Sequence, residues 1–270
     1  IMFEVLRMDW YRLRRQKYLL TGLLLGLGMI ALAYAFATLL SDPETVNAMQ
    51  AQGAEITAED IADGAALAGY TLQQYMHQML FAGGFWVSLM AVFTGVYCAE
   101  DYTGSAVKNI FSVLGCRWPY VVGRSLCLLV YNGLLMAAYL LVPLALSPVL
   151  VFSAVGGSWL DWLQMYLAAC LVGWAISMCA FFLSTLLRRE GWMVLFALLV
   201  GMGLPAVSLG AVCRLLHLPD LSRFTIFGCS QMITLDFRPV QYLHIAVVCL
   251  VWVVMYGLLT HLSLTRRDQA

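Results

Sequence analysis

Five or six long apolar runs follow one another along this 270-residue chain, and they constrain its fold more than any other feature. Each run is close to the ~20 residues that an α-helix needs to cross the hydrocarbon core of a bilayer. Only 11% of the residues are charged, whereas a soluble domain carries about a quarter. No regular alternation over ~10-residue segments, typical of membrane β-strands, is present. The sequence therefore predicts an all-α, polytopic membrane protein.

We expect six transmembrane helices and a hydrophilic external loop at residues 41–78. Prolines at 143 and 148 should bend or end the third span, and Pro205 should kink the fifth. The letters SDPE at 41–44 and TAED at 57–60 are typical of helix starts, so helix is expected within the external loop. The predicted spans are residues 18–40, 79–99, 120–147, 160–187, 192–209 and 243–264.

Basic residues near the span ends predict the orientation of the chain. Of the 15 lysines and arginines, 12 lie in the N-terminal segment, the loop between spans 2 and 3, the turn between spans 4 and 5, and the tail at 265–270. Arg124 is counted with the loop. Only Arg214, Arg223 and Arg238 lie on the other side. Because basic residues collect on the cytoplasmic side, both termini are expected to be cytoplasmic.

Residues 2–17 precede the first span and combine apolar with basic residues. Phe3, Leu6, Trp10 and Leu13 recur at helical spacing, and the basic side chains occupy the other faces. This pattern predicts an amphipathic helix that lies in the membrane interface. The alternative is a plain basic anchor for the first span.

Motifs of common catalytic sites are missing from the sequence. It contains no phosphate-binding loop, no HExxH and no GxSxG. The four histidines are scattered near span ends, where hydrogen bonding at the interface is the expected role. Almost no ionisable residue falls at the predicted depth of the spans, which disfavours an ion-driven carrier. We therefore expect neither an enzyme nor a metal site, and no cofactor in this chain.

The eight cysteines include no CxxC pair. Six of them are isolated and are expected to act as small hydrophobic residues. Cys213 and Cys229 both fall in the predicted external segment between spans 5 and 6. A disulfide between them and two free thiols are the alternatives there.

The segment EDYTGSAVKNIFSVLGCRWPY, residues 100–120, is the most polar stretch between two apolar runs, and we call it the coupling segment. It predicts a short helix at about 102–115. Val107, Ile110, Phe111 and Leu114 form one apolar stripe on that helix. Such a stripe either docks into a groove of another protein or packs on its own bundle.

The coupling segment resembles the corresponding stretch of ABC-2 type transporter permeases. It is most similar to that of the six-span permeases of bacterial peptide-antibiotic immunity and peptide-export systems. The resemblance implies that this stretch is the coupling helix that docks on an ATP-binding cassette subunit. The residues that match the family by position are Glu100, Gly104, Ser105, Lys108, Asn109, Gly115 and Arg117.

The same resemblance implies a bacterial plasma-membrane exporter. Two permease copies, identical or different, would form the pathway, each with a separate ATPase subunit that binds ATP and Mg²⁺. The apolar spans favour an amphipathic or hydrophobic cargo, such as an antimicrobial peptide or a lipid-like molecule. Besides these subunits the expected partner is membrane lipid, and nucleic acid is not expected. The alternatives are a six-span scaffold or assembly protein and an intramembrane enzyme without a recognisable motif.

Overall fold

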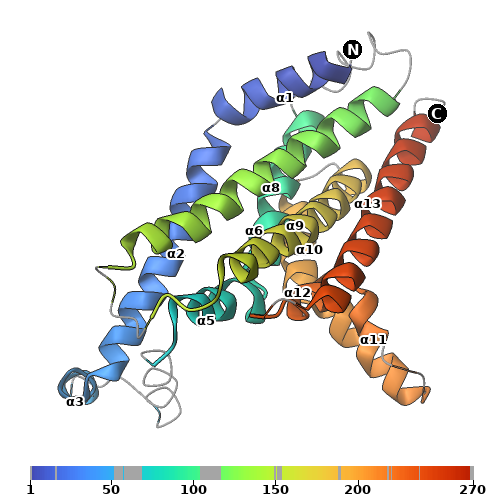
Figure 1. Cartoon of the computed structure of the whole chain (residues 1–270). Helices are drawn as coiled ribbons and strands as arrows, with labels where there is room; N and C mark the ends of the chain where they lie inside the picture. Colours follow the sequence, from blue (N-terminus) through green and yellow to red (C-terminus); the bar gives the residue numbers. More distant parts are fainter. Residues whose placement is uncertain are drawn as a thin grey trace.

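The computed structural model describes residues 2–15, 17–51, 57, 69–103, 117–148, 150, 154–187, 190–217, 219, 221–236 and 238–267. Throughout these ranges the regular structure is helical, without strands (Figure 1). Four helices are each long and apolar enough to cross a membrane, and two bent helix pairs raise the number to as many as six. The prediction of an all-α membrane protein is confirmed at this level.

The four long helices lie close to predicted spans. They are α2 (Tyr18–Ser41), α8 (Trp118–Leu146), α9 (Trp159–Leu187) and α13 (Pro239–Arg267). Pro143 does not end α8 but lies inside its last turn, where the missing N–H removes only one of the final backbone hydrogen bonds. The helix then ends before Pro148.

At the positions of the other two predicted spans the structure has bent helix pairs. The first pair comprises α5 (Leu72–His77), a π-helical turn η1 (Gln78–Ala82) and α6 (Phe85–Thr103), and the second comprises α10 (Glu190–Gly201) and α11 (Leu204–Leu215). Each pair bends by 51°. The bends fall at Gly84 and Gly203, which have φ of 68° and 78°. Glycine adopts this left-handed conformation without steric cost. The second bend is therefore at Gly203 and not at Pro205, which lies in the first turn of α11, where proline is well tolerated.

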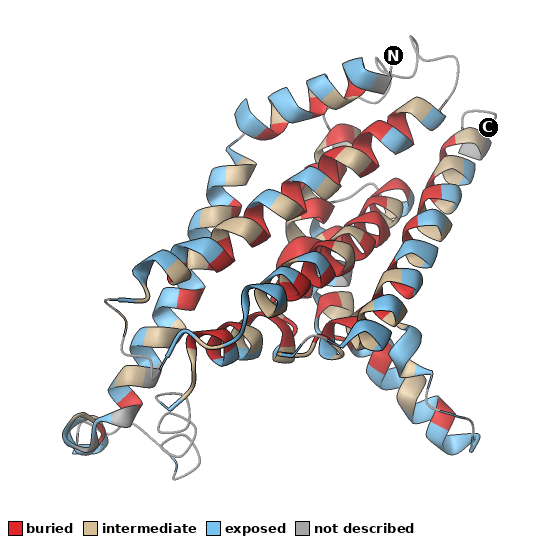
Figure 2. Cartoon of the chain, viewed as in Figure 1, coloured by how far each residue is buried: buried red, intermediate tan, exposed pale blue. Residues whose placement is uncertain are grey.

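Helix α9 forms the centre of the bundle. It packs against α13, α6, α8 and α10, and it is the most buried of the four long helices. Its hydrophobic residues show no amphipathic face, as expected of a helix surrounded by others. Figure 2 shows buried residues concentrated on α9 and on the facing sides of α6 and α8, whereas α2 and α13 turn a face outward.

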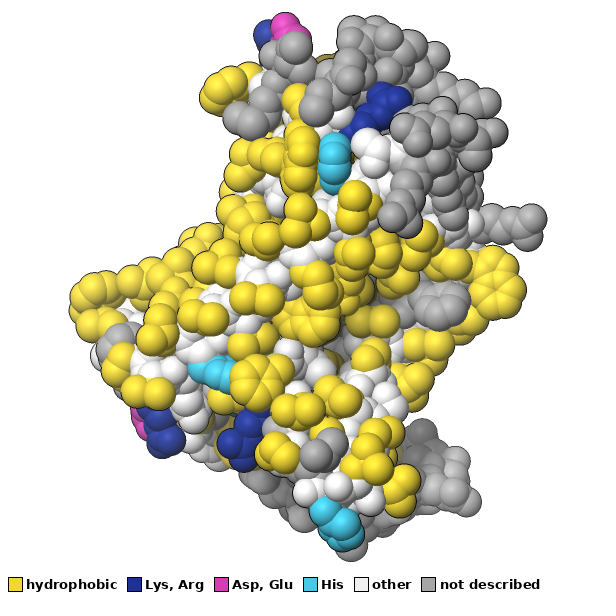
Figure 3. Space-filling model, turned by 90° about the vertical axis from the view of Figure 1, so that its right-hand side faces the viewer, with side chains coloured by type: hydrophobic (Ala, Val, Ile, Leu, Met, Phe, Trp, Pro, Cys, Tyr) yellow, Lys and Arg dark blue, Asp and Glu magenta, His cyan; other side chains and the backbone are white. Residues whose placement is uncertain are grey.

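The outward faces of the long helices are strongly apolar. On α13 the exposed residues Val247, Val251 and Val254 recur at helical spacing, with 53%, 61% and 60% exposure. On α2, Leu24 and Leu32 are 62% and 67% exposed. Figure 3 shows hydrophobic side chains covering the middle of one face, with the coloured charged groups near its two ends. An apolar surface of this extent fits contact with lipid.

The connections lie at the two ends of the bundle. Figure 1 shows both termini at one end, together with α1 (Met2–Arg15). At the opposite end lie α3 (Pro43–Ala51), α11 and α12 (Ile226–Gln231). Asp42, which follows α2, accepts hydrogen bonds from the Glu44 N–H and the Thr45 hydroxyl, and so caps the start of α3. Helix within residues 41–78 was predicted, and α3 is one such helix; the TAED stretch lies largely outside the described residues.

Candidate functional site

A group of buried ions lies at the end of the bundle that carries the termini. Asp9 comes from α1, Asp101 from the end of α6 and Arg124 from the second turn of α8, and none of the three is exposed. Arg12 of α1 joins them with a side chain that is 20% exposed. We call these four residues the charge cluster. Two arginines and two aspartates balance in formal charge, as buried ions require.

Arg124 is the centre of the charge cluster. Its Nη1 donates to Asp9 Oδ1 and to the hydroxyl of Tyr97, the latter at 2.9 Å. Its Nη2 donates to Asp101 Oδ2, while Arg12 donates to the other oxygen of Asp101. The planar guanidinium can serve several partners at once, which an ammonium group cannot do in the same geometry. One side chain of α8 therefore binds both α1 and α6.

Tyrosines enclose these ions. The Arg124 guanidinium lies over the Tyr97 ring, with Cζ 4.2 Å from the ring centroid, in cation–π geometry. The Tyr97 hydroxyl donates to the backbone carbonyl of Asp9 at 3.2 Å. Tyr120 donates to Asp101 Oδ2 at 3.0 Å. The rings exclude water while their hydroxyls supply hydrogen bonds, so the ions are buried but solvated by protein.

Helix α1 is held against the bundle by a stripe that the sequence analysis did not identify. Val5, Asp9 and Leu13 recur every four residues and are all buried. This spacing places them on one face of the helix, against α8. Asp9 is the polar centre of an otherwise apolar contact, and its ion pair with Arg124 makes that contact possible.

The predicted apolar face of α1 is therefore only partly buried in the bundle. Leu13 is buried, but Phe3 and Trp10 are 76% and 38% exposed. The helix has one face that docks on α8 and another that leaves aromatic side chains outside. Exposed aromatic residues on a basic helix fit contact with the membrane interface.

Burial raises the pKa of Asp9 above its ordinary value, although the positive charge of Arg124 acts in the opposite direction. The nearby charge of Asp101 raises it further. Asp9 Oδ2 has no hydrogen-bond partner among the described residues. Asp9 thus binds a proton more readily than an exposed aspartate.

Two of the predicted coupling residues lie within the described structure. Glu100, in the last turn of α6, accepts a hydrogen bond from the Tyr18 hydroxyl at the start of α2. Arg117 immediately precedes α8. The other predicted coupling residues lie outside the described residues: Gly104, Ser105, Val107, Lys108, Asn109, Ile110, Phe111, Leu114 and Gly115.

The charge cluster joins the helices that precede and follow residues 104–116 of the coupling segment. Asp101 is on the helix that leads into residues 104–116, and Arg124 is on the helix that follows them. Their ion pair joins the two ends of this stretch, and α1 is fastened to the same point through Asp9 and Arg12. Glu100, which the sequence analysis selected, is the immediate neighbour of Asp101.

Sequence reasoning missed most of this cluster. Arg124 was assigned to the loop between spans 2 and 3, but it is a fully buried residue of α8. The expectation that the spans hold almost no ionisable residue needs correction at this end of the bundle. An available signal was an arginine within an apolar run, because a charge in that setting needs a partner. Asp9, an acid in a basic helix, was a second signal.

The two cysteines considered for a disulfide are both free thiols. Cys213 and Cys229 are buried, and the Cys229 thiol donates a hydrogen bond to the backbone carbonyl of Arg223 at 3.7 Å. The Cys213–Cys229 bridge is therefore absent. Across the described residues, no group of three His, Cys, Asp or Glu side chains is arranged to hold a metal ion.

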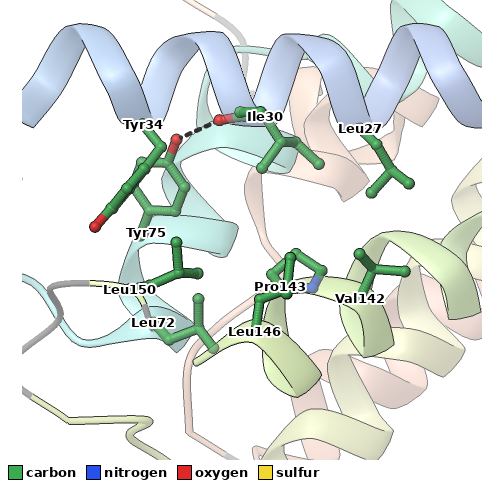
Figure 4. Close-up of a pocket in the computed structure, with 10 residues that line it drawn as sticks. Leu27, Ile30, Tyr34, Leu72, Tyr75, Val142, Pro143, Leu146 and Leu150 are labelled. Carbon is green, nitrogen blue, oxygen red and sulfur yellow. Dashed lines mark hydrogen bonds between the residues drawn. The ribbon is translucent and has the colours of Figure 1, made fainter. Parts of the chain in front are cut away.

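An apolar cavity of about 200 Å³ lies between α2, α5 and α8, towards the end away from the termini (Figure 4). Leu27, Ile30 and Pro143 line it together with the rings of Tyr34 and Tyr75. Tyr75 donates to the Ile30 carbonyl at 2.8 Å, so its hydroxyl is satisfied by α2. The lining can accommodate an aliphatic or aromatic group and offers no charged side chain.

The chain matches no protein-family model, no curated protein and no solved structure. Its class rests on the fold itself. An all-helical bundle with several apolar helices long enough to cross a bilayer defines a membrane protein.

Proposed function

We propose that the chain is the transmembrane permease subunit of an ATP-driven ABC exporter, with cytoplasmic termini in a bacterial plasma membrane. The observation that carries the proposal is the coupling segment, whose residues resemble a family coupling helix. The helices on either side of it are joined by the buried Arg124–Asp101 pair. A segment that transmits force needs a firm attachment to the bundle. The charge cluster is suited to that task.

The charge cluster suggests how movement would pass from the coupling segment into the spans. Breaking a buried ion pair by removing one partner typically costs about 3–5 kcal/mol. The ends of α1, α6 and α8 should therefore move together when a partner subunit displaces the coupling segment. ATP and Mg²⁺ would act in that partner, and two permease copies would form the pathway between them.

The proposed cargo is an amphipathic or hydrophobic molecule, such as an antimicrobial peptide or a lipid-like compound. Among the described residues the buried ion pairs are confined to one end of the bundle. The cavity of Figure 4, towards the other end, has an apolar lining. Such surfaces favour apolar groups over small ions. We propose that transport runs out of the cell or membrane, and this direction is inferred from the family resemblance.

A scaffold or assembly protein is the competing proposal, and an intramembrane enzyme is another. A scaffold would bind partners without any change on nucleotide binding. An enzyme would need a polar catalytic group open to substrate, whereas Asp9, Asp101 and Arg124 of the charge cluster are fully buried beside Tyr97 and Tyr120. Co-purification of an ATPase that responds to ATP separates the permease from both.

The test is a variant of the proposed apolar anchor, Phe111→Ala. Aromatic anchors of interfaces typically cost 2 kcal/mol or more on truncation, so we expect about a 30-fold loss of ATPase binding together with a loss of transport. Lys108→Ala is the control and should change binding much less, because exposed ion pairs contribute about 0–1 kcal/mol. Binding is measured by pull-down of the ATPase at matched membrane levels. Full retention of the ATPase by Phe111→Ala with a loss of expression would mean that the stripe packs on its own bundle.

A further inference from the structure

A second hollow lies at the end of the bundle opposite the termini, between α11, the short helix η2 (Ser222–Phe224) and α12. Its volume is about 420 Å³. The α11 wall includes the small residues Ala206, Gly210 and Ala211, and Phe227 of α12 and Met232 just after it lie on another side. A Cβ atom at position 210 would meet nothing within 4 Å, so this wall faces open space.

Two arginines line this hollow, whose other lining residues are uncharged. Arg214 comes from α11 and Arg223 from η2. Neither makes an ion pair with any residue that the structure describes, and none of the residues lining the hollow is acidic. Gln231, which also lines it, donates its amide to the carbonyls of Phe81 and Ala82 at 2.8 and 3.1 Å, and so anchors α12 to the π-helical turn. The hollow thus offers two positive charges, next to a helix α12 that is anchored to the bundle.

The surface next to the arginines is apolar and continuous with the hollow. Figure 1 shows α11 leaning away from the rest of the bundle. Val207 lines the hollow and is 67% exposed, and Val212 and Leu215 continue the exposed face at 49% and 79%. Two arginines without an ion-pair partner among the described residues thus lie beside an exposed apolar helix face. This arrangement matches a ligand with an anionic head and a hydrocarbon tail.

We propose that this hollow binds an anionic membrane lipid, with the headgroup phosphate on Arg214 and Arg223 and an acyl chain along the exposed face of α11. Arginine binds phosphate through charge-assisted hydrogen bonds, and small residues let a chain approach the helix closely. Each basic residue near a membrane surface contributes about fivefold to the affinity for anionic lipid. The lipid would fasten α11, which has few contacts with the bundle, to its surroundings.

The test measures lipid retention by the purified full-length protein with native mass spectrometry, using phosphatidylglycerol and phosphatidylcholine as probes. We expect the wild type to hold phosphatidylglycerol preferentially. Arg214→Gln with Arg223→Gln should lower its affinity roughly 30-fold and leave phosphatidylcholine unchanged. Arg238→Gln is the matched control, because this exposed arginine lies at the same end but does not line the hollow. Equal thermal-unfolding midpoints establish that the variants are folded.

A second variant separates the hollow from general surface charge. Gly210→Leu should fill the wall and reduce phosphatidylglycerol binding at least fivefold while both arginines remain. Equal binding of the two lipids by the wild type, or unchanged binding in both variants, overturns the proposal. It is also overturned if the variants alter only the number of protein copies in the complex, or only the binding of an amphipathic peptide. Inorganic phosphate that competes as well as the lipid would show that the apolar face plays no part.

Discussion

Arg124 is the residue on which the arrangement at the terminal end of the bundle depends. It forms ion pairs with Asp9 and Asp101, its guanidinium lies over the Tyr97 ring in cation–π geometry, and it is fully buried. Transfer of such a group out of water is costly, and only the combined partners offset the cost. Its removal would leave two aspartates with the partly exposed Arg12 as their remaining basic partner in the cluster. Arg124 thus links three helices that are distant in sequence.

We predict that Arg124→Leu lowers the free energy of unfolding by about 3–5 kcal/mol, because it leaves buried carboxylates without their main partner. Arg238→Leu, at an exposed position, should change it by about 0.5 kcal/mol or less. Thermal unfolding of the purified variants in detergent provides the measurement. Asp9→Leu combined with Arg124→Leu should cost less than the sum of the single changes, since the pair is coupled. Strict additivity would show that the two side chains do not depend on each other.

At the scale of helices, the two bent pairs meet at one aromatic ring. Gly84 and Gly203 both have positive φ, and a Cβ on either would lie 2.7 or 2.6 Å from Phe227 of α12. Both bends therefore require glycine for two reasons: the backbone is left-handed, and the Phe227 ring leaves no room for a Cβ atom. Phe227 also lines the hollow between α11 and α12. One side chain of the short helix α12 thus lies next to the bends of both helix pairs.

We predict that Gly203→Ala destabilises the protein by about 1–3 kcal/mol, through left-handed strain and the clash with Phe227. Gly210→Ala on the same helix is the control, because its added methyl group meets nothing and alanine favours helix by about 0.8–1 kcal/mol. Unfolding midpoints of the two variants should therefore shift in opposite directions. If Gly203→Ala unfolds like the wild type, the bend does not need its left-handed glycine.

At the scale of the whole molecule, an apolar belt separates two ends of different character. The end with both termini carries α1 and the charge cluster (Figure 1). The other end carries α3, the hollow between α11 and α12, and few basic residues. The distribution of charge between these ends is the basis for the proposed orientation in the membrane.

We predict that a membrane-impermeant maleimide labels Glu44→Cys in intact cells but reaches Arg15→Cys only after permeabilisation. Both positions are exposed, and they lie at opposite ends of the bundle. The seven described native cysteines are buried and should contribute little background. Labelling in the opposite sense would reverse the orientation and remove the coupling segment from the side where ATP is found.

The sequence alone determined the helical membrane class and the approximate positions of the helices. Both follow from local properties: a run of about 20 apolar residues forms a helix in lipid, whatever lies elsewhere in the chain. The ranges of α2, α9 and α13 differ from the predicted spans by a few residues at most of their ends, where fraying and capping decide the boundary. The polar coupling segment also stood out locally, although most of it lies outside the described residues.

Only the tertiary structure decided which side chains meet. Asp9, Asp101 and Arg124 belong to three helices, and no periodic pattern of one segment indicates that the other two will supply its counter-ions. The docking face of α1 likewise depends on Arg124, because a buried carboxylate at Asp9 needs a counter-ion, which another helix supplies. At Gly84 and Gly203 the ring of Phe227, from a different helix, leaves no room for a Cβ atom. Pairing of ions and close packing are long-range properties, and the folded arrangement of the helices determines them.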